Sequence, residues 1–191
     1  MMHFEQPPEP PTFDERCRRR GNQRLENHPS AVRPNDYWTE FKPKLADGFF
    51  DLCAYTVMYT PTGTVDHYLS VKNHHHLAYE WSNYRFCAGW LNSSKQNADD
   101  TVLDPFEVGN NWFEIILPSL QLVVTDQISP EIRPKAEYTL KRLHLQDNER
   151  VIRQRCEWYQ MYQKGELSLE GLYRKAPLIA AAVEKQKNGD A

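Results

Sequence analysis

The stretch FFDLCAYTVMYTPTGTVDHYL, residues 49–69, places the strongest constraint on the fold. Apolar and β-branched residues dominate on both sides of its turn sequence, TPTG. Pro61 and Gly63 supply the backbone conformations that a tight turn needs. Short runs of this composition around a turn are typical of β-strands. The sequence therefore predicts a hairpin, or two short strands, in this part of the chain.

Two further segments have the composition of short strands. SNYRFC, residues 82–87, is one of them. WFEIILPSLQLVV, residues 112–124, is apolar enough to be buried, but Pro118 argues against a single central strand. Between these segments, WLNSSKQN, residues 90–97, predicts one or two helical turns.

The segment before residue 49 has helical spacing. Trp38, Phe41 and Leu45 are separated by three and four residues, which places them on one face of a helix. Asn35 is a suitable N-cap residue for that helix. Pro43 removes a backbone donor and predicts that the helix bends or ends there.

The chain after residue 130 is also predicted to be helical. The segment 147–165 has Asp147 as a candidate cap and Gly165 as a stop signal, with apolar residues between them on one side. Pro177 suits the first turn of a last helix. A centre of strands and loops between helical flanks favours the α+β class over a doubly wound α/β sheet.

Charge and composition exclude several classes of protein. The net charge is −3 with nearly balanced signs, so no global basic field indicates nucleic-acid binding. The chain contains no apolar run approaching the ~18 residues of a membrane helix, and its first residues do not resemble a secretory signal. Its four cysteines are widely spaced and form no CxxC pair. We therefore expect a cytoplasmic protein with reduced thiols and no membrane association.

The first twelve residues differ from the rest of the chain. Their proline content predicts an extended, flexible and poorly ordered arm over residues 1–12. The remaining residues, 13–191, are enough for a single domain with a sizeable core.

Five polar residues fall where the predicted strands and helix meet. Asp66 and His67 end a predicted strand, Asn83 opens the next one, and Asn92 and Lys95 follow in the helical segment. Carboxylate and carboxamide oxygens bind hard divalent cations, a neutral imidazole accepts protons near pH 7, and an ammonium attracts phosphate. Neighbours on a regular strand face opposite sides, so Asp66 and His67 converge only if the strand opens there. The set has the chemistry that phosphodiester hydrolysis requires.

The spacing of these residues resembles that of the HNH endonucleases, which have a ββα-metal fold. The chain carries VDH at 65–67, WSN at 81–83 and LNSSK at 91–95, with intervals of 16 residues from His67 to Asn83 and 9 from Asn83 to Asn92. CAYT (53–56) and LDPFEV (103–108) are similar to segments around the motif in HNH nucleases of bacterial defence modules. The resemblance implies a ββα-metal core over residues 50–110 and a helical C-terminal extension over residues 130–188.

The resemblance also implies a role for each residue. His67 is the general base that activates water, and Asn83 braces the loop and orients His67. Asp66 and Asn92 hold Mg²⁺ or Mn²⁺, which stabilises the charge that develops on the phosphoryl group. Lys95 contacts the phosphate. The activity implied is metal-dependent hydrolysis of DNA.

One departure from the family concerns structural zinc. Many relatives have two CxxC pairs, but Thr56, Ala88 and Leu91 stand where cysteines are required, and Cys87 is one position out of register. We therefore expect no structural zinc, with Leu91, Trp90 and Phe86 filling its place by apolar packing.

Basic residues supply the expected nucleic-acid contacts. The segment 16–24 has five arginines in nine positions. The expected contacts are Lys72, Arg85, Lys95, Arg18, Arg19 and Arg20. The resemblance further implies a role in bacterial defence or in a mobile-element module, with an ATPase or another protein of that module as a partner.

Two alternatives remain open at the level of sequence. The chain could be a catalytically inactive ββα protein that binds nucleic acid or acts as a scaffold subunit. The triplet His74, His75 and His76 could instead bind zinc in an adaptor, although ligands of a tetrahedral site are normally separated along the chain. Solvated loop residues near a polyanion are the other interpretation of the triplet.

Overall fold

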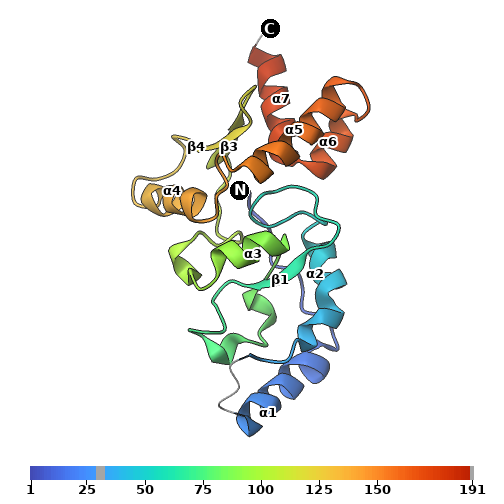
Figure 1. Ribbon diagram of the computed structural model, residues 1–191, viewed down its shortest axis with the longest axis vertical. Helices are drawn as coiled ribbons and strands as arrows, with labels where there is room; N and C mark the ends of the chain where they lie inside the picture. Colours follow the sequence, from blue (N-terminus) through green and yellow to red (C-terminus); the bar gives the residue numbers. More distant parts are fainter. Residues whose placement is uncertain (29–32, 190–191) are drawn as a thin grey trace.

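The computed structural model describes residues 1–28 and 33–189. Within them the chain forms seven α-helices and two two-stranded antiparallel sheets, which confirms the α+β class. The helix α1 (Arg20–Asn27) lies at one end of the molecule, α5 to α7 lie at the other, and α2 (Lys42–Gly48) lies between them beside β1 (Figure 1). None of the described helices combines the length and apolarity needed to cross a membrane.

The first sheet pairs strands that are distant in sequence. β1 (Thr64–His67) runs antiparallel to β2 (Tyr84–Cys87), with Val65 opposite Phe86 and His67 opposite Tyr84. The expected pairing across the TPTG turn is wrong, because the segment before that turn makes only an isolated bridge between Leu52 and Tyr59. That segment contains Val57 with a φ of 56°, a left-handed conformation that interrupts a strand.

The helix α3 (Gly89–Lys95) follows β2 directly and packs against β1 (Figure 1). The strand over 82–87 and the helical turns over 90–97 are therefore confirmed, with shorter bounds. Leu91 and Lys95, four residues apart, face the protein interior.

The second sheet is a hairpin of β3 (Phe113–Ile116) and β4 (Gln121–Val124). Pro118 lies in the turn between these strands, as its position in the apolar segment 112–124 predicts. α4 (Arg133–Arg142) packs on β4, and α7 (Pro177–Gly189) packs on β3.

The C-terminal helices begin and end close to the predicted positions. α5 spans Glu149–Gln163 and α6 spans Leu169–Lys175. The cap of α5 is Asn148 rather than Asp147, because the Asn148 side chain accepts the amide hydrogen of Arg150. Gly165, with a φ of 74°, follows the helix end, and Pro177 opens α7.

The N-terminal flank differs from the prediction in detail. A short 3₁₀ turn, Tyr37–Phe41, begins after Asp36 rather than after Asn35. Pro43 stands in the first turn of α2, where its missing amide hydrogen costs nothing, so it starts this helix instead of ending one. Phe41 and Leu45 are buried as expected.

The N-terminal arm has no regular secondary structure up to residue 10, yet it is tied to the protein core. Met1 and Phe4 are buried, and the Phe4 ring lies 4.9 Å from that of Phe49. The Trp81 indole donates a 2.8 Å hydrogen bond to the Pro7 carbonyl. The packed arm differs from the poorly ordered one expected from its prolines, because its apolar side chains find partners in the core.

Candidate active site

The candidate site lies where α3 meets the end of β1. The Asn92 side chain donates to the Val65 carbonyl at 3.2 Å, and Lys95 Nζ donates to the carbonyls of His67 and Tyr68 at 2.8 and 2.9 Å. These bonds satisfy carbonyl groups of β1 and of the residue that follows it, so α3 is fixed against this strand.

Asp66 points toward α3 and is 1% exposed. Its Oδ2 accepts a 2.7 Å hydrogen bond from Tyr55, and its Oδ1 lies 3.2 Å from Lys95 Nζ. Burial, together with the nearby Asp66 charge, raises the pKa of Tyr55 well above its usual value, so its hydroxyl stays a donor. Lys95 is fully buried at 0% exposure. Each oxygen of the carboxylate therefore has a partner.

His67 contacts a different set of side chains from Asp66. Its ring packs edge-on against Trp38 at 4.7 Å and Tyr84 at 5.1 Å. Asp66 and His67 thus face opposite sides of β1, as regular alternation requires, and the expected opening of the strand between them does not occur.

The imidazole of His67 has a defined tautomer. Its Nε2 lies 2.9 Å from the carbonyl oxygen of Ala78. A carbonyl only accepts, so Nε2 carries the hydrogen and Nδ1 keeps a lone pair. Burial lowers the pKa of His67 below 6.5, against the opposing effects of the Ala78 carbonyl and Asp66. The ring is therefore neutral near pH 7.

Asn83 is buried and holds both ends of the loop between β1 and β2. Its Oδ1 accepts from the Leu69 amide at 2.8 Å, and its Nδ2 donates to the carbonyls of Leu69 and Leu77 at 2.9 and 3.2 Å. Leu77 precedes Ala78, so this brace also fixes the carbonyl that orients His67.

The histidine triplet lies within the same loop. Asp99 anchors the loop by accepting hydrogen bonds from the Ser70 amide and the Asn73 side chain, and its Oδ2 lies 3.9 Å from His74 Nε2. Burial acts to raise the pKa of Asp99, but these hydrogen bonds outweigh it and lower the pKa. Within residues 1–28 and 33–189, no group of three or more His, Cys, Asp or Glu side chains is arranged to hold a metal ion.

The positions at which the HNH resemblance would place zinc ligands lie in the core or packed against it. Cys53 and Cys87 are buried free thiols, and burial raises the pKa of Cys87 well above its usual value. Phe86 and Leu91 are buried beside them in the same apolar core, and Trp90 is half-buried against it.

Two of the expected nucleic-acid contacts are internal. Arg85 is 3% exposed, forms a two-bond ion pair with Asp104, and stacks on Phe106 at 3.7 Å. Its Nη1 also donates to the backbone carbonyls of Ser82 and Tyr84. Neither Arg85 nor Lys95 is on the surface, so neither can contact a phosphate in this conformation.

The other expected contacts are more accessible. Lys72 and Arg20 are exposed, and Arg20 lies 4.3 Å above the Tyr37 ring. Arg19 is exposed but paired with Asp14 at 2.7 Å. Arg18 is half-buried and contacts three carboxylates, those of Glu9, Asp14 and Glu80. The hydrogen bonds that Arg18 donates to the Glu9 carboxylate are the main cause of the raised pKa of Arg18.

Two residues that contact this site carry no functional signal in the sequence. Tyr55 binds Asp66, and Trp38 packs on His67. The spacing of Trp38 indicates a helix face, and the composition around Tyr55 indicates a strand, so neither pattern predicts contact with the site.

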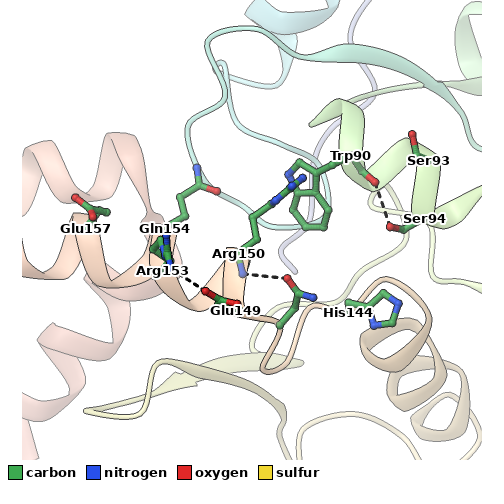
Figure 2. A pocket seen from close by; sticks show the side chains of 10 residues that line it. Trp90, Ser93, Ser94, His144, Glu149, Arg150, Arg153, Gln154 and Glu157 are labelled. Carbon is green, nitrogen blue, oxygen red and sulfur yellow. Dashed lines mark hydrogen bonds and ion pairs between the residues drawn. The ribbon is translucent and has the colours of Figure 1, made fainter.

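A cleft of about 1050 Å³ lies on the other side of α3, between this helix and α5. Figure 2 shows Arg150 reaching from α5 toward Trp90 on α3. The Arg150 Cζ atom lies 5.4 Å from the centre of the Trp90 ring. Arg153 is paired with Glu149, and Glu157 lies on the same wall. The two arginines and two glutamates cancel in charge, so the cleft has no net preference for an anion.

In comparisons with known proteins, no protein-family model and no curated protein matches the chain.

Proposed function

We propose that the chain is an HNH-type endonuclease that hydrolyses phosphodiester bonds in DNA. The proposal is supported by the order of the elements: His67 ends β1, Asn83 directly precedes β2, and Asn92 and Lys95 lie in α3, an order that resembles a ββα-metal core. The single observation that carries the proposal is the orientation of His67, whose Nε2 hydrogen is bound to the Ala78 carbonyl, so that Nδ1 of the neutral ring keeps its lone pair.

His67 would act as the general base. Its Nδ1 accepts a proton from the attacking water, and the Ala78 carbonyl stabilises the imidazolium that forms. Asn83 acts as a positioning residue, because it binds the Leu77 carbonyl and so holds the loop segment that contains Ala78. Trp38 and Tyr84 restrict the ring to one orientation.

The donor chemistry near Asp66 fits a hard divalent cation. The ammonium of Lys95 already lies among three oxygens, those of the Asp66 carboxylate and two backbone carbonyls. Asp66 and Asn92, which contact α3 and β1 respectively, would hold Mg²⁺ or Mn²⁺. When bound, the ion supplies charge stabilisation for the phosphoryl oxygens and the leaving oxygen.

A cleavage assay tests the proposal. Plasmid DNA, single-stranded DNA and RNA are incubated with the protein in Mg²⁺ or Mn²⁺, with EDTA as a control. We expect DNA cleavage that EDTA abolishes, and a loss of about 10²–10⁴-fold in the His67→Ala variant. The matched control is His76→Ala, which removes an exposed histidine of the neighbouring loop. Cleavage that survives the His67→Ala change would contradict the proposed mechanism.

A specific observation favours a second candidate, a ββα protein that binds nucleic acid without cutting it. Asp66 faces away from His67 and is enclosed by Tyr55 and Lys95. Equal DNA binding by the wild type and the His67→Ala variant, with no cleavage of any nucleic acid in either metal, would support this candidate.

A further inference from the structure

The fully buried ammonium of Lys95 occupies an oxygen-lined site. Asp66 Oδ1 lies 3.2 Å from Lys95 Nζ, and the carbonyls of His67 and Tyr68 lie at 2.8 and 2.9 Å. A carboxylate and backbone carbonyls are also the ligands that hard divalent cations select. The site therefore binds a cation in the free protein, and that cation belongs to the chain itself.

Two cations cannot share this carboxylate without cost. Charges of the same sign a few ångströms apart repel strongly where water is excluded, and Asp66 is almost completely buried. Its other oxygen is already engaged by Tyr55. A divalent ion that binds Asp66 must therefore displace the Lys95 ammonium.

Release of Lys95 requires a local opening at the end of α3. Lys95 is the last residue of α3, and Gln96 follows with a φ of 50°, which ends the helix. Unwinding of the last turn, which also breaks the 3.1 Å hydrogen bond from Arg142 to the Lys95 carbonyl, would free the side chain while Leu91 and the start of α3 stay packed. A released lysine could then meet the phosphate of a substrate as a point charge.

We propose that Lys95 is a tethered competitor for the divalent cation at Asp66, so that metal binds only when Lys95 leaves. The proposal rests on the metal site assigned under the proposed function. Because only the fraction of molecules with Lys95 displaced can bind metal, the apparent affinity is reduced by that fraction.

The test measures Mn²⁺ binding by electron paramagnetic resonance, without any substrate. Lys95→Met keeps most of the side-chain volume and removes the charge. We expect this variant to bind Mn²⁺ at least about tenfold more tightly than the wild type. The added change Asp66→Asn should abolish that gain. Lys72→Met, which removes an exposed lysine from the neighbouring loop, is the matched control and should leave the affinity near that of the wild type.

Equal or weaker Mn²⁺ binding by Lys95→Met would overturn the proposal. The variant could lose its fold, because it leaves a buried carboxylate unpaired. Circular dichroism then decides: we expect Mn²⁺ to restore the fold by binding Asp66, and a chain that stays unfolded in Mn²⁺ also overturns the proposal.

The outcome is separable from the outcome of the cleavage assay. Tighter Mn²⁺ binding by Lys95→Met in a protein that cuts no nucleic acid would overturn only the proposed function. Cleavage that depends on His67, together with unchanged Mn²⁺ affinity in Lys95→Met, would overturn only the role of Lys95.

Discussion

His67 and Asp66 show how neighbouring residues acquire different environments. On one side of β1, the His67 ring packs among aromatic side chains, where burial favours its neutral form. On the other side, the Asp66 carboxylate contacts the Lys95 ammonium and the Tyr55 hydroxyl. The dipeptide suggested their chemistry, but the side of the strand on which each lies determines what each group can do.

The lowered pKa of His67 predicts a dependence of stability on pH. The unfolded histidine titrates at about pH 6.5, so below that pH the unfolded state binds a proton that the folded state resists. We expect the free energy of unfolding to fall as pH decreases through this value toward the lower pKa of the folded state. Urea unfolding at a series of pH values measures it.

The control for this prediction is His67→Gln, which does not titrate but can still donate to Ala78. The slope of stability against pH should be shallower in this variant than in the wild type between about pH 7 and about pH 5. Parallel slopes would show that other groups cause the acid sensitivity.

At the scale of elements, a buried ion pair connects β2 to the segment that follows α3. Arg85 and Asp104 form two hydrogen bonds, and the guanidinium is covered by Phe106 and Tyr68. By sequence, Arg85 is an expected nucleic-acid contact because it is basic, and Asp104 lies within LDPFEV, a segment of the HNH resemblance. Their burial assigns them a structural role.

Breaking this pair should destabilise the protein. Asp104→Asn keeps the shape of the side chain but leaves the Arg85 charge without a counter-ion, and we expect a loss of about 3–5 kcal/mol in the free energy of unfolding. Denaturant unfolding measures the loss. Glu149→Gln, which breaks the exposed pair with Arg153, is the control and should change stability little. Similar losses in both variants would argue against the importance of burial.

At the scale of the whole molecule, the N-terminal arm joins distant parts of the fold. Phe4 packs on Phe49, its amide donates to the Pro105 carbonyl at 3.0 Å, and Pro7 accepts from Trp81. The arm therefore connects the end of α2, the start of the β2 region and the segment after α3.

Truncating Phe4 tests whether the arm belongs to the cooperative fold. Phe4 is 2% exposed, so Phe4→Ala should cost about 3–5 kcal/mol through lost burial and the cavity that remains. Thermal and urea unfolding measure the cost, with Gln6→Ala at an exposed arm position as the control. A loss no greater than that of Gln6→Ala would restore the expectation of a poorly ordered arm.

The local elements were predictable because their signals are local. The strand at 84–87, the helix at 89–95, the break at Pro118 and the helix start at Pro177 follow from composition, turn residues and caps within a few positions. The spacing of His67, Asn83 and Asn92 was also readable, since it requires only residue types and intervals.

Tertiary structure decided what the sequence left open. The pairing of β1 with β2, the closure of Asp66 by Tyr55 and Lys95, and the burial of Arg85 all join residues that are far apart in the chain. A charged side chain is usually exposed, so its burial can be predicted only when its partner is known. Long-range contacts supply that partner, and no short interval along the sequence encodes them.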